Sequence, residues 1–304
     1  MSRMKEFRFI EIASRIFERR KREVIAGAGD DDCAVIKIGD QYLILTTDNL
    51  HEKADFPESM SPYEMGHMAV AVNFSDLAGT GAKPEYFLFD ITIREGIDEG
   101  FFVQILKGIE DLAKKYDAEV VGGDIDFGDE LYITGFAAGI ARKPALQSGA
   151  RTGDRVYITG VTGKAELSLE QLFSGKKREE IPFISSLFTP EPKIWEGIEI
   201  SEYASAMTDI SDSLAISLHN ISRKSGVKIV LKEEYFPLTE LTELVSYGRA
   251  LELFLYGGGD FELVFTSEES DRGIMIGEVM DGSGVFIEKR SGIEEVDFRG
   301  YSHF

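Results

Sequence analysis

The first half of the chain mixes segments that have the spacing of amphipathic helices with segments enriched in β-branched and aromatic residues. Apolar side chains recur every three or four residues in the helical segments, and Pro62 favours a helix start because proline fits the first helical turn. The β-rich segments favour extended strands instead. The pattern predicts helices within residues 1–23, 61–84 and 99–118, and strands at 40–48, 84–93, 119–125 and 130–141.

A stretch that is poor in bulky apolar residues and rich in glycine, serine and proline separates two halves of similar size at residues 143–155. We place the domain boundary near residue 147, which gives domains 1–146 and 147–304. The expected fold class is α+β, with two mixed domains rather than one doubly wound sheet. The second half again shows both patterns and predicts helices at 164–173 and 211–226, a helical region at 239–254, and strands at 156–160, 205–210, 227–231, 260–266 and 284–289.

Acidic residues outnumber basic ones by 54 to 33 among 304 residues, so the formal net charge is −21. Such a charge repels nucleic acid and anionic membrane surfaces, and we expect neither as a partner. An anionic small molecule is repelled as well unless cations lie between it and the protein. The hydrophobic fraction of 43% is that of an ordinary globular chain, so a folded core is expected.

Cys33 is the single cysteine, which excludes an intrachain disulfide, and no Cys/His cluster suggests zinc or iron–sulfur chemistry. Charged residues such as Glu11 and Arg15 interrupt the apolar positions of the N-terminal segment, unlike the apolar run of a signal peptide. No stretch reaches the roughly 18 apolar residues of a membrane span. We therefore expect a soluble, cytoplasmic protein.

Aspartates recur where strands are expected to end or in the loops that follow, and such loops commonly present functional groups on a rigid scaffold. Each one alone is typical of a turn or a helix cap, but their recurrence favours a common site. Converging carboxylates repel one another unless cations lie between them, and Mg²⁺ prefers oxygen ligands and completes its shell with phosphate oxygens. The pattern thus indicates a phosphorylated ligand held through several Mg²⁺ ions. The aspartates concerned are Asp30, Asp31, Asp32, Asp48, Asp76, Asp124, Asp209, Asp212 and Asp260.

Other phosphate-binding and hydrolytic motifs do not occur in the sequence. The segment from Gly160 to Lys164 is too short for a P-loop, and Ala165 stands where that motif has a hydroxyl. There is no protein-kinase motif set, no GxSxG and no HExxH. The four histidines are far apart in sequence, and each alone is more typical of a structural or surface residue than of a ligand: His51, His67, His219 and His303.

Eight motifs allow a more specific comparison. In chain order they read GAGDDDCAV, TTDNL, AVAVNFSDLAGTGAKP, GGDI, ASAMTDISDSLA, LYGGGDFELVFT, IGEVMDGSGV and GYSHF. The series resembles that of the thiamine-monophosphate kinases, in the superfamily of aminoimidazole ribonucleotide synthetase, over nearly the whole chain. The resemblance implies ATP- and Mg²⁺-dependent phosphorylation of thiamine monophosphate to thiamine diphosphate by direct in-line transfer. It also implies a homodimer whose N-terminal domains form a dimer-spanning β-barrel, with the nucleotide site near the subunit interface and the C-terminal domain completing the active site.

The resemblance also assigns roles to residues, motif by motif. It implies metal binding by Asp31, Asp32, Thr46, Thr47, Asp48, Asp76, Asp124, Asp209 and Asp212. It implies ATP binding by Thr47, Gly122, Gly123, Asp124 and Ser211, and a catalytic role for Asp124 and Asp212. Two alternatives stay open: another ATP-dependent enzyme of the superfamily, and a catalytically silent nucleotide- or metal-binding protein.

Three departures from the family's motifs bear on these roles. The family has GDD where this chain has GDDD, so the register leaves open whether Asp30 replaces Asp31 as a ligand. Ser213 stands where the DISDG motif has glycine. Gly259 replaces the glutamate of GGED and removes a carboxylate expected there.

Overall fold

The computed structural model describes residues 3–301, with side chains described from Arg8 onward. The chain divides into two compact units. The first unit comprises the chain up to Pro144 together with Phe188–Trp195, and the second comprises Ala145–Leu187 together with the chain from Glu196 onward. The assignment of ATP and metal binding to residues 1–146, and of a completing role to residues 147–304, stays a prediction.

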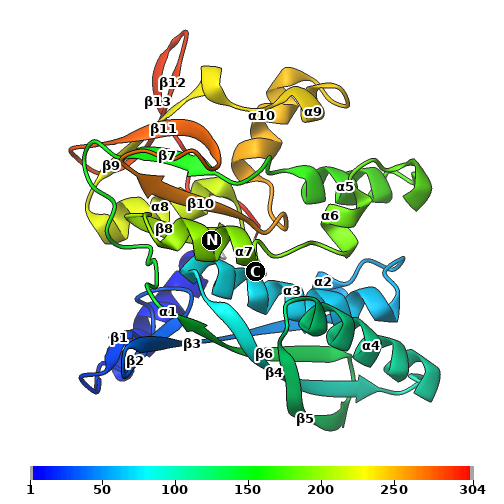
Figure 1. Cartoon of the computed structure of the whole chain (residues 1–304). Coiled ribbons are helices and arrows are strands. Elements are labelled where there is room, and N and C mark those ends of the chain that lie inside the picture. Colours follow the sequence, from blue (N-terminus) through cyan, green and yellow to red (C-terminus); the bar gives the residue numbers. More distant parts are fainter. Residues whose placement is uncertain (1–2, 302–304) are drawn as a thin grey trace. The chain divides into compact units, whose positions relative to one another are not determined.

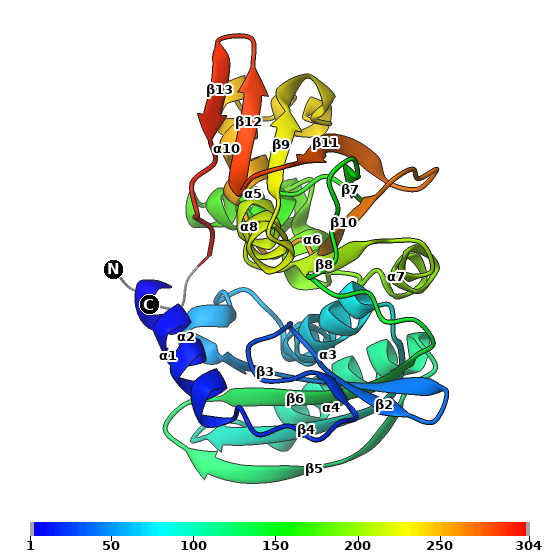
Figure 2. The same cartoon turned by 90° about the vertical axis from the view of Figure 1, so that its left-hand side faces the viewer.

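The first unit is built on a six-stranded sheet in the order β1-β2-β3-β6-β4-β5 (Figure 1). Neighbouring strands are antiparallel, except for the parallel pair β4–β5. The long helices α3 and α4 lie on one face of this sheet (Figure 2). The strands are β1 (Val24–Ala26), β2 (Ala34–Ile38), β3 (Gln41–His51), β4 (Lys83–Arg94), β5 (Glu119–Gly128) and β6 (Tyr132–Ala141), and the helices are α1 (Arg3–Ile16), α2 (Glu52–Asp55), α3 (Pro62–Thr80) and α4 (Glu99–Lys115).

Helix α3 is buried over most of its length, and it packs against β3, β4 and β6 of the sheet and against α4. Ser61 begins the helix as an N-cap held in a capping box, which satisfies backbone N–H groups of the first turn. Gly66 and Gly108 let the backbones of α3 and α4 touch, since a Cβ at Gly66 would lie 2.0 Å from the carbonyl oxygen of Ile105. This close packing fixes the α3 residues that face the sheet.

The six-stranded sheet is open, because β1 and β5 lie at its two edges in the described chain. The expected β-barrel is therefore not formed within one described chain. The sheet face that points away from α3 carries large apolar side chains on adjacent strands, each more than a third exposed. They are Leu45 on β3, Phe136 on β6, and Tyr86 and Leu88 on β4.

The second unit is built on a seven-stranded sheet in the order β13-β12-β9-β11-β7-β10-β8. Helices α8 and α10 bury apolar faces in its core, where Leu218, Phe254 and Val264 belong to one buried cluster. Its strands are β7 (Arg155–Ile158), β8 (Ala206–Ile210), β9 (Lys228–Lys232), β10 (Glu262–Ser267), β11 (Ile274–Met280), β12 (Gly284–Lys289) and β13 (Gly292–Glu295). The remaining helices are α5 (Lys164–Phe173), η1 (Arg178–Glu180), α6 (Ile184–Phe188), α7 (Ile194–Ser201), α8 (Leu214–Ser225), η2 (Glu233–Tyr235), α9 (Thr239–Thr242) and α10 (Tyr247–Tyr256).

The expected mixture of helices and strands around two sheets is confirmed. The helical region predicted at 239–254 consists of two helices, because α9 ends at Thr242 and a new N-cap at Ser246 begins α10. Strands β1, β2, β11 and β13 were not predicted. None of the helices within residues 3–301 has the length and apolar character that crossing a membrane requires.

Candidate functional site

The aspartates singled out by the sequence do not all lie at strand ends. Asp48 lies inside β3, Asp124 inside β5 and Asp76 in the interior of α3, so the prediction of a strand-end position is wrong for these three. Asp209 lies at the end of β8, and Asp212 lies between β8 and α8, as expected. Asp124 lies on the face of the sheet that stays accessible, whereas Asp48 lies on the face that packs against α3.

One group of candidates lies where β3 faces α3. Thr46 Oγ1 donates a hydrogen bond to Asp76 Oδ2 on α3 at 2.5 Å, and Asp48 shares the face of Thr46 because it lies two residues further along the strand. Asn73, fully buried on α3, accepts a hydrogen bond from the backbone N–H of Asp48 at 3.2 Å. Gly135, which pairs with Asp48, makes room for this amide, since a Cβ there would lie 2.2 Å from Asn73 Nδ2. Asn73 thus fixes Asp48 relative to α3.

The loop between β1 and β2 contributes carboxylates around the buried Cys33. Burial raises the pKa of the Cys33 thiol well above its usual value, and the charge of Asp76 raises it further. The charges of Asp32 and Asp31 act in the same direction. The charges of three candidate carboxylates thus act on one buried thiol of the first unit.

Asp30, the first acid of the run, has structural contacts. Its carboxylate accepts a hydrogen bond from the backbone N–H of Gly27 at 2.9 Å, which closes a turn. The same carboxylate forms an ion pair with Arg20 through two guanidinium nitrogens. These contacts engage the Asp30 carboxylate and so favour Asp31 and Asp32 as the pair of ligands, which stays a prediction.

Thr47 and Asp124 lie on the opposite face of the sheet. Cross-strand pairing places Asp124 in one row with Asn49 of β3, so their side chains share a face, whereas Asp48 points the other way. Strands β6 and β4 separate β3 from β5, which amounts to three strand spacings, or roughly 14 Å. Within one chain, the fold therefore does not bring Asp124 to Asp48.

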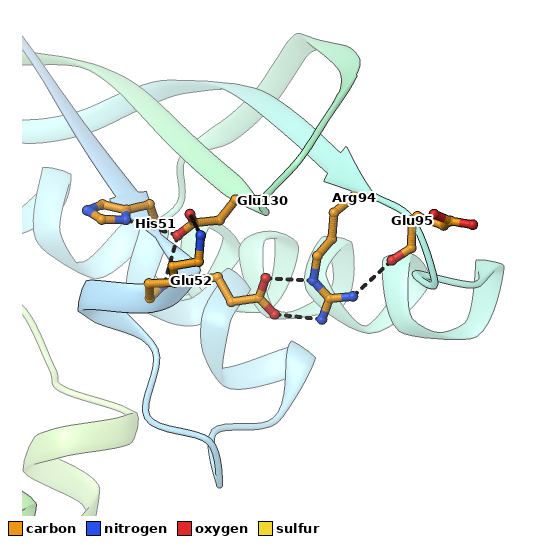
Figure 3. A network of polar contacts seen from close by, with 6 residues as sticks. His51, Glu52, Arg94, Glu95 and Glu130 are labelled. Carbon is orange, nitrogen blue, oxygen red and sulfur yellow. Dashed lines mark hydrogen bonds and ion pairs between the residues drawn. The ribbon is translucent and has the colours of Figure 1, made fainter.

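A polar network secures the end of β3 just beyond these residues (Figure 3). Glu130 is 8% exposed and accepts hydrogen bonds from the backbone N–H of Lys53 at 2.9 Å and from His51 Nδ1 at 3.1 Å, with Lys53 Nζ at 2.7 Å. These contacts, those of Lys53 foremost, lower the pKa of Glu130 to about 2. Arg94 at the end of β4 binds both carboxylate oxygens of Glu52 at 2.6 Å. The network ties β3, β4 and β6 together.

In the second unit, the end of β8 and the loop 211–213 that follows it carry the other candidate acids. Asp209 is buried at 3% exposure, whereas Ser211 is exposed and Asp212 is half-buried. Ser213 is the N-cap of α8, and its hydroxyl accepts a hydrogen bond from the backbone N–H three residues later. Its φ of 177° is extended, so this position does not need the glycine that the family has there.

The glycine-rich segment before β10 packs against the same loop. A Cβ at Gly258 would lie 2.7 Å from the carbonyl oxygen of Asp212, so glycine allows the close approach. The backbone N–H of Gly259 donates to the carbonyl oxygen of Ser211 at 2.7 Å. Gly259 has a φ of +83°, in the left-handed region that favours glycine, which explains the residue found in place of the family's glutamate.

Asp260 has a structural role in this segment. It is buried and accepts hydrogen bonds from the backbone N–H groups of Gly163 at 2.5 Å and Ala165 at 3.0 Å, at the start of α5. Burial raises its pKa to about 7, although these hydrogen bonds favour the charged form. Asp260 therefore anchors the start of α5 to the glycine-rich segment.

The residues around Cys33 have the chemistry of Mg²⁺ ligands, although they do not form a complete coordination site. Among the side chains described from Arg8 to Tyr301, no three of His, Cys, Asp or Glu are grouped closely enough to hold a metal ion. The donors nearest one another are carboxylates and the Thr46 hydroxyl, all hard oxygen donors of the kind that Mg²⁺ binds. Several like charges in one region also provide the electrostatic attraction for a divalent cation.

The histidines take no part in such a donor set. His67 is buried and its Nε2–H donates to the carbonyl oxygen of Pro190 at 2.9 Å; burial lowers its pKa. His219 Nε2–H donates to the carbonyl oxygen of Val296 at 2.8 Å. The interpretation of these two as structural residues is confirmed, and His303, with the end of the GYSHF motif, lies outside the described residues.

Sequence reasoning missed the residues that position the acids. Asn73 could be interpreted only as a loop-binding amide, and Gly135 had no signal, because their contact joins α3 to β6 across 62 residues of chain. Glu130 and Arg94 also looked like ordinary surface charges. Such residues are recognised only when the register of the sheet is known.

Comparison with known proteins gives the class to which this fold and site belong. The model of the AIR synthase related protein N-terminal domain matches residues 30–141, the stretch from the acidic loop to the end of β6. This stretch of the first unit is thus similar to the N-terminal domain of AIR synthase related proteins.

The relatives of the whole chain are more specific. Thiamine-monophosphate kinase of Archaeoglobus fulgidus is 52% identical over 301 residues, covering 99% of this chain and 98% of that protein. Thiamine-monophosphate kinase of Pyrococcus horikoshii is 34% identical and covers 100% of this chain and 97% of its own length. The chain belongs to the thiamine-monophosphate kinase family.

Solved structures agree with this membership. AaThiL complexed with AMPPCP and TMP superposes with a TM-score of 0.89 at 30% identity, over 98% of this chain and 97% of that one. Thiamine-monophosphate kinase from Stenotrophomonas maltophilia gives a TM-score of 0.78 at 27% identity, over 91% and 94% of the two chains. Hydrogenase maturation protein HypE in complex with ATP gives 0.70 at 17% identity, over 84% of each chain, and shows the shared fold alone.

Proposed function

We propose that the protein transfers the γ-phosphoryl group of ATP to thiamine monophosphate, giving thiamine diphosphate and ADP in the cytoplasm. The observation that carries the proposal is the 52% identity with the Archaeoglobus fulgidus thiamine-monophosphate kinase along 99% of the chain. The complex of AaThiL with AMPPCP and TMP supports the same pair of substrates. In this reaction a phosphate oxygen of thiamine monophosphate bonds to the γ-phosphorus, and the β,γ-bridging bond breaks as ADP leaves with the electron pair.

The aspartates and threonines described above supply the ligands for metal and nucleotide. Bound Mg²⁺ neutralises charge on the transferred phosphoryl group. The carboxylates around Cys33 hold the cations that bind the triphosphate. Thr47 and Asp124, on the open face of the sheet, contact the nucleotide. The proposed metal ligands are Asp31, Asp32, Thr46, Thr47, Asp48, Asp76, Asp124, Asp209 and Asp212; Gly122, Gly123 and Ser211 contact ATP, and Asp124 and Asp212 act directly at the transferred group.

The chain does not need a strong general base for this reaction. The nucleophile is a phosphate oxygen that is already ionised near neutral pH, so no proton has to be removed in the transition state. His67 and His219 are engaged with backbone carbonyls, in agreement with this mechanism. The protein's own contribution is to position the two phosphates in line and to place charge around them.

The decisive experiment is a complete turnover assay. The protein is incubated with ATP, Mg²⁺ and thiamine monophosphate, and ADP and thiamine diphosphate are quantified in the same samples. One thiamine diphosphate per ADP is expected, with no ADP release when thiamine monophosphate is omitted. Tight ATP binding without thiamine diphosphate formation at high protein concentration would establish a silent nucleotide-binding protein instead.

We propose that the active form is a homodimer joined through the open face of the six-stranded sheet. The exposed side chains Leu45, Tyr86, Leu88 and Phe136 support this, because contiguous exposed apolar surface is typical of interfaces. The edge strands β1 and β5 also leave a sheet that a second copy can extend toward a barrel. Asp124 does not reach Asp48 within one chain, so we propose that it serves the site of the partner subunit.

Mixing two inactive variants tests this arrangement. Asp76→Asn and Asp124→Asn are co-expressed with different tags, and dimers that carry both tags are isolated. If Asp124 acts in the partner's site, each mixed dimer has one site with both changes and one intact site, and about half of the wild-type activity is expected. If both residues serve the same chain, every site carries one change and mixed dimers stay inactive.

A further inference from the structure

Ser213 makes two hydrogen bonds with its hydroxyl. It is fully buried and accepts from the backbone N–H of Ile216 at 3.1 Å, as an N-cap does. It also donates its proton to the carbonyl oxygen of Arg299 at 2.8 Å. The first bond caps α8, but the second reaches a segment 86 residues further along the chain and has no role in capping.

That segment, residues 296–301, is called the C-terminal strap here. The backbone N–H of Tyr301 donates to the carbonyl oxygen of Asp212 at 3.0 Å, next to the Ser213 contact. Gly300 lies between these two bonds, and a Cβ there would lie 2.5 Å from Ser213 Oγ and 2.7 Å from the carbonyl oxygen of Asp212. Serine at 213 and glycine at 300 therefore fit each other closely.

The strap is held elsewhere by contacts that do not reach the acidic loop. His219 packs edge-on against Phe298, with 5.4 Å between ring centroids. The Arg299 guanidinium lies 4.0 Å over the ring of Tyr256 and pairs with Glu252 at 3.0 Å. These contacts fix the strap to α8 and α10. The strap is therefore a stable point of attachment for the loop that carries Asp212.

We infer that Ser213 is a positioning residue for phosphoryl transfer, which fastens the C-terminal strap to the loop that carries Asp212. The loop is held on one side by the bond between Gly259 and Ser211 and on the other by the strap. A glycine at 213 has no hydroxyl, so the Arg299 carbonyl and the first turn of α8 both lose their partner. The inference rests on the proposed function, because only there is Asp212 a ligand and a catalytic residue.

The test compares Ser213→Ala with Ser222→Ala. Ser222 is a matched control: it lies on the same helix, is buried, and bonds to the carbonyl oxygen of Val227 and the backbone N–H of Gly284. Hydrogen exchange is measured on peptides covering the strap, without ligands. We expect exchange of the Tyr301 amide to be about tenfold faster in Ser213→Ala, the effect of losing one neutral hydrogen bond, and unchanged in Ser222→Ala.

The second readout is the Mg²⁺ dependence of thiamine monophosphate phosphorylation. In Ser213→Ala the Mg²⁺ concentration at half-maximal rate should rise about tenfold, while the rate at saturating Mg²⁺ stays within about twofold of wild type. Ser222→Ala should keep the wild-type Mg²⁺ dependence. A wild-type protein without kinase activity would refute the proposed function, and the exchange experiment would still decide whether Ser213 fastens the strap.

Gly300→Ala provides an independent variant in case Ser213→Ala folds poorly. Its Cβ should push the strap away from the loop. Gly300→Ala should therefore reproduce the faster hydrogen exchange and the higher Mg²⁺ concentration at half-maximal rate. Adding Ser213→Gly removes two of the three closest atoms and should restore part of the loss, giving a non-additive double-mutant cycle. Unchanged exchange of the strap in Ser213→Ala, or faster exchange with wild-type Mg²⁺ dependence, would overturn the positioning role.

Discussion

Asp76→Asn probes the assignment of a carboxylate that lies inside a helix, where a metal ligand is least expected from sequence. The substitution keeps the size of the side chain and an oxygen that can accept from Thr46, which lies 2.5 Å away. It removes one formal charge from the group of acids around Cys33. A structural role in α3 would therefore survive the change, whereas a role in binding Mg²⁺ would not.

The expected magnitude follows from the charge that is lost. A carboxylate in the shell of a catalytic Mg²⁺ supports several kcal/mol of transition-state stabilisation, and about 3 kcal/mol corresponds to a rate lower by a factor of roughly 100 to 200. In the absence of metal, Asp76→Asn reduces the repulsion between the remaining carboxylates. The free energy of unfolding should therefore stay equal or rise by up to about 1 kcal/mol.

The assay combines initial rates at limiting Mg²⁺, urea unfolding in a chelator, and a titration of the Cys33 thiolate by ultraviolet absorbance. The charge of Asp76 raises the pKa of Cys33, so this pKa should fall in Asp76→Asn. The matched control is Asp40→Asn, which removes an exposed aspartate from the turn between β2 and β3 and should change none of the three readouts.

Near-normal turnover of Asp76→Asn at limiting Mg²⁺ would refute the metal assignment. A large loss of stability in the chelator would instead make Asp76 a structural residue of α3. An unchanged pKa of Cys33 would contradict the arrangement of charges around the thiol itself, independently of any activity.

Three further predictions concern stability. Glu130, whose pKa is lowered to about 2, stabilises the fold above its unfolded value near 4.5 and loses this contribution as the pH falls toward 2; urea unfolding from pH 7 to 3 should therefore show a smaller acid loss in Glu130→Gln. Gly135→Ala should destabilise by about 1–3 kcal/mol in urea, because its Cβ would overlap the amide of Asn73, whereas Gly248→Ala, with nothing within 4 Å, should not. Asp260, with a pKa raised to about 7, favours the fold at low pH and loses that contribution as the pH rises through 7; metal-free unfolding between pH 5 and 8 should show this slope in wild type and lack it in Asp260→Asn.

The parts of the fold that sequence could predict are those where one physical pattern extends over many residues. Helix α3 and strand β3 are long and uniformly patterned, and both were predicted close to their observed positions. Strand β1 has three residues, Val24–Ala26, too few for an alternating pattern to stand out. The break before α10 depends on the cap at Ser246, whose neighbours continue the apolar spacing of a helix.

For the candidate site, residue types predict the kind of chemistry but not which residues lie close together. Carboxylates beside hydroxyls indicate hard-cation chemistry from the sequence alone. Whether two of these carboxylates lie close together depends on the register of the strands. Asp48 and Asn49 are neighbours in sequence but point to opposite faces of the sheet, and Asp124 lies on the same face as Asn49. The pairing of β4 with β5 also shifts by one residue near Leu88, which no local pattern announces. Register and bulges are tertiary properties.

Two of the three departures from the family's motifs show that residue type alone is also a poor guide to a lost function. From the sequence alone, serine in place of glycine at 213 and glycine in place of glutamate at 259 both suggest a weakened site. The backbone explains both: Ser213 is extended at a φ of 177° and gains a cap and a contact to the strap, while Gly259 occupies a left-handed turn at +83°. Each residue suits the conformation in which it stands. A departure at a motif position therefore argues against function only when the conformation or the contacts of that position are lost, and here the loop that carries Asp212 is held from both sides.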